Sequence, residues 1–239
     1  MQETRYAIVN GEKIPVLISD ENEALLAAKA AGRAIVGLWR EDAQGDEWCV
    51  ADTLIADMEV ADERFLERIA RRRLGLPWDI CETERLTIRE IAERDYEEIV
   101  KNRVDESLDT VENVADYTKR HYEVFEFGFW TVEEKKSGSL VGVVGFRIPQ
   151  DDGIRGVDYY VLSLSDKNSW NDTLEIGYHI FPEYRRKGYA KEACRAAIEY
   201  AEEEFGTVQF IVRIGKENIV SKKMAESLGF VKAEEDPFD

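Results

Sequence analysis

The sequence predicts an α/β (α+β) fold in two domains, and three observations lead to this prediction. Short apolar runs rich in β-branched residues alternate with amphipathic runs of helical period along the 239 residues. The alternation pauses at residues 75–79, "GLPWD", where Pro77 is typical of a linker. The composition is 44% hydrophobic and 10% aromatic, which favours folded domains over disorder. We therefore expect a small α/β domain over residues 1–78 and a larger domain over residues 79–239.

In the first domain, three apolar runs are expected to be strands and two amphipathic runs are expected to be helices. The first helix begins with Asp20 as its N-cap and ends at Gly32. The second helix covers residues 62–75 and carries cations in its last turn. Strands that alternate with helices are typical of a parallel sheet. The expected strands are residues 14–19, 33–39 and 52–58.

The second domain begins with an alternating strand over residues 82–91, in which Leu86 and Ile88 are apolar. Helical runs follow over about residues 94–122. Two apolar runs joined through "KKSG" then predict a hairpin. The remaining order is strand, strand, helix, strand, helix and strand. The residues are 127–134 and 139–149 for the hairpin, followed by 157–165, 173–180, 189–206, 208–214, 218–229 and 230–235.

Positive charge gathers where the strand that ends at residue 180 leads into the next helix. Arg185, Arg186 and Lys187 are consecutive, and Gly188 follows them directly. The first N–H groups of a helix lack intrahelical partners and lie at the positive end of the helix dipole, so such a site binds phosphate readily. One interpretation is a pyrophosphate cradle, and the other is a turn glycine with solvated cations. The stretch matches neither G-x-x-x-x-G-K-[ST] nor G-x-G-x-x-G.

Composition narrows the class of partner. The net charge of -18 argues against general nucleic-acid binding, because phosphate contacts need a basic face. It favours a cationic partner, or it serves only solubility. No apolar run approaches the about 20 residues of a membrane-spanning helix, and no signal peptide is visible, so we expect a cytoplasmic protein without a membrane partner. Cys49, Cys81 and Cys194 are far apart and lack metal-ligand spacing, which predicts free thiols and no metal site.

Several stretches of the second domain match one known family in order and spacing. Arg185-x-x-Gly188-x-Ala190, after a strand and at the start of a helix, resembles the acetyl-CoA-binding signature of the GNAT N-acetyltransferase superfamily. Residues 83–90 and 174–193 are similar to the first strand, and to the fourth strand with its helix, in the subgroup of ribosomal-protein alanine acetyltransferases. The chain also resembles a second signature of the family, at Asn218, Ser221, Glu226 and Gly229-Phe230.

The resemblance, over about residues 82–235, implies a mixed central sheet with flanking helices and an acetyltransferase activity. In this family a primary amine attacks acetyl-CoA directly, without a covalent enzyme intermediate and without a metal. Main-chain amides near the end of the fourth strand, at Ile180 or Phe181, would hold the oxyanion and the pantetheine arm. The other positions that the resemblance assigns to the cofactor are Arg185, Arg186, Lys187, Gly188, Tyr189, Ala190, Asn218, Ser221 and Lys223.

The resemblance assigns the chemistry to Glu175 and Ser221. Glu175 matches a position where a glutamate serves as the base, and alternation places it on one strand face with His179, the second candidate base. The alternative for Glu175 is a strand carboxylate paired with a cation. Ser221 matches a serine that could hydrogen-bond the CoA sulfur, and its alternative is a surface or capping residue. The helical tyrosine that many members use as an acid is missing, since Ala225 stands in its place.

The resemblance leaves the acceptor open between a protein N-terminus and a small cationic amine. Asp151, Asp152, Asp158 and Tyr159 are candidate contacts for it. The alternative function is a non-catalytic module that binds or senses acyl-CoA. The first domain weakly resembles the last part of an incomplete haloacid-dehalogenase-type core without its nucleophile motif, although a coincidental α/β pattern fits equally. We expect this domain to be accessory, in homodimer formation, substrate capture or regulation.

Overall fold

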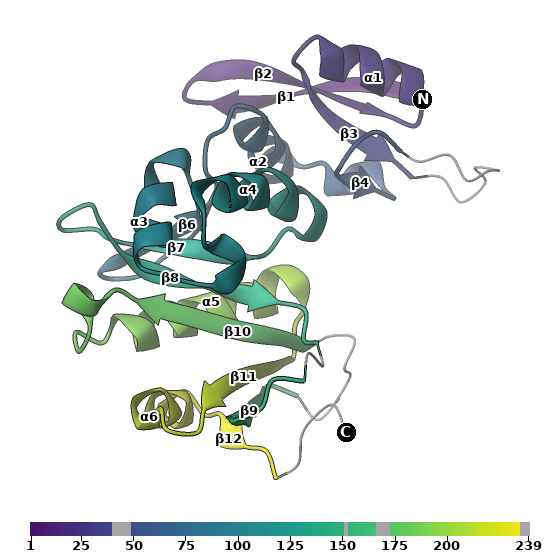
Figure 1. Cartoon of the computed structure of the whole chain (residues 1–239). Coiled ribbons are helices and arrows are strands. Elements are labelled where there is room, and N and C mark those ends of the chain that lie inside the picture. Colours follow the sequence, from purple (N-terminus) through teal and green to yellow (C-terminus); the bar gives the residue numbers. More distant parts are fainter. Residues whose placement is uncertain (40–48, 151–152, 166–172, 235–239) are drawn as a thin grey trace. The chain divides into compact units, whose positions relative to one another are not determined.

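The computed structural model describes residues 1–39, 49–150, 153–165 and 173–234. Its contacts divide the chain into two compact units (Figure 1). The first unit consists of Met1–Trp78 together with Asp116–Glu126, so it takes in a helical segment from beyond residue 78. The second unit consists of Asp79–Ala115 and Phe127–Asp239.

The first unit contains a four-stranded sheet with the order β1-β2-β3-β4. β2, β3 and β4 are parallel, as the sequence predicts, but β1 pairs antiparallel with β2. Asn10 and Gly11 both have positive φ and form the tight turn between β1 and β2. The sequence analysis missed β1, because only Ala7 and Val9 of this edge strand are buried. The strands are β1 (Gln2–Val9), β2 (Glu12–Ser19), β3 (Ala34–Leu38) and β4 (Leu54–Ile55).

Two apolar clusters flank this sheet, because successive side chains of β2 point to opposite faces. Leu17 joins Leu25 and Ala28 of α1 (Asn22–Ala30) in one cluster. Its neighbour Ile18 joins Phe65 and other residues of α2 (Glu63–Arg73) in the other cluster. The sheet is therefore buried on both faces.

Helices α1 and α2 of the first unit differ in their N-caps. Asp62 caps α2 and accepts a hydrogen bond from the Phe65 amide at 2.8 Å. The prediction that Asp20 caps α1 is wrong, because Glu21 is the N-cap residue and makes no side-chain cap bond. The Asp20 carboxylate instead binds the ammonium group of Met1.

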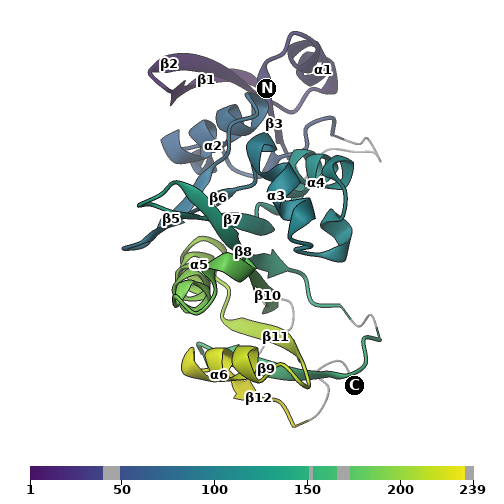
Figure 2. The same cartoon turned by 60° about the vertical axis from the view of Figure 1, so that its left-hand side comes forward.

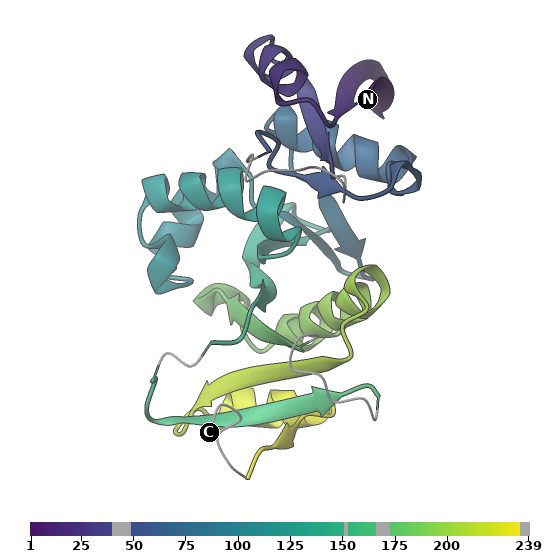
Figure 3. The ribbon, with the colours of Figure 1, turned by 90° about the vertical axis from the view of Figure 1, so that its right-hand side faces the viewer.

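The second unit contains an eight-stranded sheet with the order β12-β9-β11-β10-β8-β7-β6-β5. All neighbours are antiparallel except β10 and β11, which are parallel. Figure 3 shows β9 and β11 side by side and in opposite directions near the lower end of the ribbon. The predicted mixed central sheet is therefore confirmed. Its strands are β5 (Asp79–Glu82), β6 (Leu86–Glu90), β7 (Phe129–Glu134), β8 (Ser139–Arg147), β9 (Val157–Ser163), β10 (Thr173–Ile180), β11 (Gln209–Gly215) and β12 (Val231–Lys232).

Helices flank both faces of this sheet. Figure 2 shows α5 and α6 on one side and α3 on the other. α5 presents Ala193, Ala197 and Ala201 to the sheet, and these small buried residues allow a close approach to β8 and β10. The helices of this unit are α3 (Tyr96–Lys101), α5 (Tyr189–Phe205) and α6 (Ile219–Ser227), and the residues of α4 (Val111–Phe125) are divided between the two units. Short 3-10 helices occupy Met58–Val60, Glu93–Asp95, Glu106–Leu108 and Pro182–Tyr184.

β10 and β11 separate soon after they begin. Their backbones pair only over Thr173–Glu175, opposite residues 209–211. Beyond this point β10 stays on β8 as far as Ile180, while β11 stays on β9 as far as Gly215 (Figure 1). The sheet therefore opens as a V between two adjacent parallel strands.

Candidate active site

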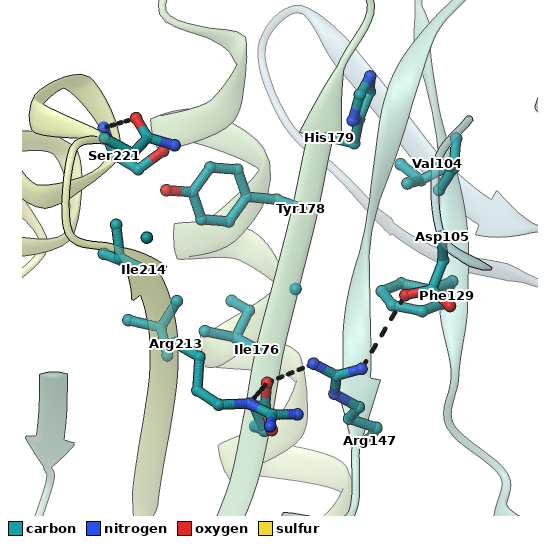
Figure 4. Close-up of a pocket in the computed structure, with 16 residues that line it drawn as sticks. Val104, Asp105, Phe129, Arg147, Ile176, Tyr178, His179, Arg213, Ile214 and Ser221 are labelled. Carbon is teal, nitrogen blue, oxygen red and sulfur yellow. Dashed lines mark hydrogen bonds and ion pairs between the residues drawn. The ribbon is translucent and has the colours of Figure 1, made fainter. Parts of the chain in front are cut away.

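A pocket of about 220 Å³ lies at the opening between β10 and β11 (Figure 4). Five consecutive residues of β10, Glu175–His179, form its central wall. β7 and β8 contribute Phe129, Val143 and Arg147, while β11 and the residues after it contribute Val212, Arg213, Ile214, Gly215, Asn218 and Ser221. Val104 and Asp105 complete the lining.

The pocket has two sides because β10 runs through it. Figure 4 shows Tyr178 pointing toward Ser221 on one side of β10, and His179 on the other side with Val104. Gly177 directly precedes Tyr178 on β10, and a Cβ at this position would stand 2.8 Å from Cε1 of Phe129. A glycine is therefore needed at this position to let β10 pass close to the phenyl ring.

Glu175 is the most buried charged group of the pocket, with 2% of the residue exposed. Its Oε1 accepts hydrogen bonds from Nη2 of Arg147 at 2.6 Å and from Nε of Arg213 at 2.9 Å. Its Oε2 is buried and has no hydrogen-bond partner in the described part of the chain. The alternative noted from the sequence, a strand carboxylate paired with cations, thus describes the contacts of this side chain.

His179 is half-buried, and its Nε2 lies out of contact with solvent without a hydrogen-bond partner among the described residues. Burial, together with the nearby charge of Arg185, lowers the pKa of His179 below its ordinary value. The imidazole is therefore predominantly neutral at pH 7, and a neutral imidazole can accept a proton.

The end of β10 leads into α5 through a short cationic loop. Arg186 and Gly188 have φ angles of 63° and 84°, so the chain turns sharply before α5. The amides of residues 186–190 have no hydrogen-bond acceptor within the described ranges. Because Gly188 is the N-cap residue of α5 and has no side chain, nothing of its own covers these donors. The predicted cradle is thus an open helix N-terminus.

Arg85, which the sequence analysis did not single out, braces this loop. Its Nη1 donates to the carbonyl of Lys187 at 2.9 Å, and its Nε donates to Glu192 in the first turn of α5 at 2.7 Å. Its guanidinium also lies over the ring of Tyr189, 4.8 Å from the ring centroid. Arg85 lies within the strand predicted at residues 82–91, and its partners, more than a hundred residues away in the chain, could not be predicted from the sequence.

The cations of the loop differ in their availability. Arg185 donates from Nε to the carbonyl of Ile180 at 2.9 Å, which holds the loop against the end of β10. Arg186 and Lys187 are exposed, and the Lys187 ammonium lies 5.0 Å from the centre of the Tyr184 ring. Two cationic side chains beside the open amides are therefore accessible to an anion.

The amides of Ile180 and Phe181, the two candidates at the end of β10, differ in their hydrogen bonding. The Phe181 amide donates to the carbonyl of Val141 at 2.9 Å, and the Phe181 carbonyl accepts from Tyr184 at 2.9 Å. The Phe181 amide is therefore not free to hold an oxyanion, while the assignment of Phe181 to the cofactor stays a prediction. N–H groups alternate in direction along a strand, so those of Ile180 and Tyr178 point to the side that β11 has left.

α6 contributes Asn218 and Ser221 to the pocket. Oδ1 of Asn218 accepts from the Ser221 amide at 3.1 Å and caps the helix. Lys223 lies exposed on α6. Ala225, at the position where many family members carry a tyrosine, is buried.

Asp158, a candidate acceptor contact, already has two cationic partners in the structure. Its carboxylate binds Lys222 at 2.5 Å and Lys232 at 3.1 Å, which holds α6 and β12 to β9. Asp151 and Asp152 lie outside the described residues.

Tyr178 is one of several pocket residues that were not predicted from the sequence. Its hydroxyl is buried and makes no hydrogen bond of good geometry within the described ranges, although the hydroxyl of Ser221 is nearby. Burial raises the pKa of Tyr178 to about 12, so the phenol stays protonated. The alternation that placed Glu175 on one face of β10 places Tyr178 on the other, and only the position of α6 shows what it faces.

A match to a family model shows the family of this chain. A family model described as "Acetyltransferase (GNAT) domain" matches residues 85–231, which is more than half of the chain. The chain belongs to the GNAT acetyltransferase family. The match spans both the cradle and the V between β10 and β11, so these features belong to the acetyltransferase domain.

Individual relatives of this GNAT acetyltransferase are distant. The uncharacterized N-acetyltransferase YoaA of Bacillus subtilis is 24% identical over 165 residues, which cover 64% of this chain and 83% of YoaA. A Bordetella pertussis protein assigned to the GNAT family has a TM-score of 0.50 and 18% identity, and the match covers 66% of this chain and 92% of that chain. A GNAT-family acetyltransferase from Bacillus anthracis has a TM-score of 0.45 and 24% identity, with 62% and 81% covered. The match to the Bordetella pertussis protein shows a shared fold.

Two further findings concern the described part of this acetyltransferase. None of its helices is both long and apolar enough to cross a membrane. Its His, Cys, Asp and Glu side chains form no group of three that could hold a metal ion in those ranges.

Proposed function

We propose that this GNAT acetyltransferase transfers an acetyl group from acetyl-CoA to a primary amine. The observation that carries the proposal is the pocket at the V between β10 and β11, whose central strand leads through a short loop to an open helix N-terminus with accessible cations. A phosphate group at the helix N-terminus and a thioester in the V would use both features at once. The acetyl group would then lie against β10, with the amine arriving from the side of His179.

Different residues of the chain would hold different parts of coenzyme A. The amides of residues 186–190, with the side chains of Arg186 and Lys187, would hold the pyrophosphate. Arg185 would act indirectly, since it fixes the loop to Ile180. Asn218, Ser221 and Lys223 would approach the cofactor from α6. The Ile180 amide, which points to the open side of β10, would stabilise the oxyanion of the tetrahedral intermediate.

The amine must lose its proton to become a nucleophile, and two side chains on the acceptor side of β10 could take it. Glu175, the first candidate from the sequence, already accepts hydrogen bonds from two guanidinium groups. An ammonium that approached its Oε2 would also meet both positive charges. His179 is neutral and its Nε2 is unpartnered among the described residues. We therefore assign the role of base to His179, and assign to Glu175 the role of holding Arg147 and Arg213 in place.

The acceptor is proposed only as a class, a primary amine on a small cationic molecule or a protein N-terminus. The net charge of -18 supports a cationic acceptor, because such a surface attracts cations. The alternative is a module that binds acyl-CoA without chemistry. The neutral imidazole of His179 beside the V favours the enzyme, since a binding module has no need of a proton acceptor there.

Two measurements on the full-length chain test the proposal. Calorimetry with coenzyme A and with acetyl-CoA should give a saturable heat of binding, and a panel of primary amines should give acetyl-dependent release of the CoA thiol. Absence of any heat with both ligands would refute the cofactor assignment. Binding without thiol release from any amine of the panel would favour the non-catalytic alternative.

A further inference from the structure

We propose that the Tyr178 hydroxyl donates a hydrogen bond to the sulfur of coenzyme A as the thioester C–S bond breaks. This inference rests on the proposed function and adds a residue to it. Tyr178 would take the place of the helical tyrosine, whose position here is occupied by Ala225.

The position of the hydroxyl is the first support. Tyr178 lies on β10 beyond Glu175, the last residue at which β10 pairs with β11. Its side chain points across the V toward Ser221, on the side of β10 opposite to His179 (Figure 4). A thioester lying in the V would therefore have Tyr178 on one side and the attacking amine on the other.

The unpartnered state of the hydroxyl is the second support. Buried hydroxyl groups almost always have a hydrogen-bond partner, because leaving one unsatisfied costs free energy. The Tyr178 hydroxyl is out of contact with solvent and makes no hydrogen bond of good geometry within the described residues. It lines the pocket, so a ligand atom could supply the missing partner.

The protonation state fits a donor. Burial raises the pKa of Tyr178 to about 12, so the side chain carries its proton throughout the physiological pH range. A neutral phenol next to a developing anion can donate a hydrogen bond without giving up its proton. Donors that are fixed and desolvated stabilise such charge more strongly than water does.

The reaction balances with Tyr178 in this role. The ammonium of the acceptor gives one proton to His179, which passes it to solvent. The neutral amine nitrogen then attacks the thioester carbon and forms the N–C bond, and the nitrogen gives its second proton to His179. When the tetrahedral intermediate collapses, the C–S bond breaks and its electron pair goes to sulfur. The products are the amide, the CoA thiolate held by the Tyr178 hydroxyl, and the proton on His179, which both return to solvent equilibrium on release.

Ser221 is the second hydroxyl within reach of the sulfur. Its amide is held by Asn218, but its side chain is only half-buried. Water competes for a half-exposed hydroxyl, so we expect Tyr178 to contribute the larger share of the stabilisation.

The test uses the thiol of bound coenzyme A and needs no acceptor. Ultraviolet absorbance of the thiolate gives the pKa of the bound thiol in wild type and in Tyr178→Phe, as a difference from the ligand-free protein. The protein background is small for two of the three thiols, because burial raises the pKa of Cys81 to about 12 and also that of Cys194. Loss of a hydrogen bond to the thiolate should raise the pKa of the bound thiol by about one unit.

Three comparisons make the result decisive. Tyr122→Phe, which removes a buried hydroxyl in the first unit, should leave the thiol pKa unchanged. Ser221→Ala should shift it less than Tyr178→Phe does. With any accepted amine, Tyr178→Phe should lower kcat about tenfold while the Kd of acetyl-CoA stays unchanged, since the donor acts on the thiolate.

The outcomes separate this inference from the proposed function. If wild type binds coenzyme A and Tyr178→Phe leaves the thiol pKa unchanged, Tyr178 is not the donor and the proposed function stands. If wild type does not bind coenzyme A, the proposed function fails and the role of Tyr178 fails with it. A thermal unfolding midpoint close to that of wild type establishes that Tyr178→Phe is folded, and Ser221→Ala supplies a second variant on the same readout.

Discussion

Arg213 on β11 donates at 2.9 Å to the carboxylate of Glu175, the last residue of β10 that pairs with β11 through the backbone. The ion pair therefore adds a side-chain link at the vertex of the V, where the backbone ladder ends. Both side chains are nearly inaccessible to solvent, at 5% and 2% exposed. Arg147 adds a second donor to the same oxygen from β8, so one carboxylate joins three neighbouring strands.

Glu175→Gln should lower the free energy of unfolding by about 1.5–3 kcal/mol. An amide keeps an acceptor oxygen but not the charge, so two guanidinium groups lose their counter-ion. Urea denaturation of the full chain measures the change, with the exposed Glu183→Gln as the matched control on the loop after β10. An unchanged unfolding midpoint in Glu175→Gln would show that the vertex does not depend on this charge.

The pH dependence of kcat should distinguish His179 from Glu175 as the base. His179 has a lowered pKa, so its imidazole is neutral and active above that pKa and becomes protonated and inactive as the pH falls through it. With saturating acceptor, kcat should therefore decline on the acid side with a midpoint below pH 6.5. His179→Gln should lose this acid limb and about two orders of magnitude in kcat.

Two controls belong to that experiment. His121→Gln removes the chain's other histidine and should keep the acid limb. Glu175→Gln should keep the limb as well, even where its turnover is reduced by a displaced Arg147. If the limb disappears in Glu175→Gln and persists in His179→Gln, the assignment of the base must be reversed.

Local patterns in the sequence predicted those parts of the fold that depend on neighbours in the chain. The strand at 173–180, the helix at 189–206 and the open N-terminus at Gly188 all follow from periodicity and from one turn residue. β1 was missed because an edge strand with few buried residues has little apolar alternation. The antiparallel pairing of β1 depends on the turn at Asn10 and Gly11. Asn-Gly is typical of a hairpin turn, but a prediction made from apolar runs alone does not use it.

The candidate site could be predicted only where the backbone alone defines it. Side-chain partners at long range, such as Arg85 with Glu192, required the folded structure. The same holds for Glu175, whose two arginines come from β8 and β11. The amide of Phe181 illustrates the limit of strand reasoning, because a shift of one residue reverses the direction in which an N–H group points.

Asp95→Ala should destabilise the second unit by about 1–3 kcal/mol, because Arg89 loses one of its two carboxylate partners and keeps Glu133 at 2.9 Å. Arg89 is nearly inaccessible to solvent and binds both oxygens of Asp95, at 2.6 and 2.9 Å, and loses this bidentate partner in the variant. Asp95 also accepts from the Ala92 amide at 2.7 Å, so a turn before α3 loses its cap. Urea denaturation measures the effect, and Lys101→Ala, which breaks an exposed pair with Glu98, should leave the midpoint nearly unchanged. Equal midpoints for the two variants would contradict the argument.

Gly188→Ala should weaken the binding of coenzyme A about tenfold. The φ of +84° at this N-cap position costs a residue with a Cβ about 1–2 kcal/mol, and the new methyl group would lie 3.4 Å from Nη2 of Arg85. The free loop can relax away from this conformation, so the ligand must restore it on binding, and that free energy is lost from the affinity.

Gly206→Ala is the matched control, because Gly206 has a φ of +66° at the other end of α5 with no atom within 4 Å. Calorimetry with coenzyme A should show a raised Kd for Gly188→Ala alone, and an equal Kd for both variants would mean that the amides around Gly188 do not hold the pyrophosphate.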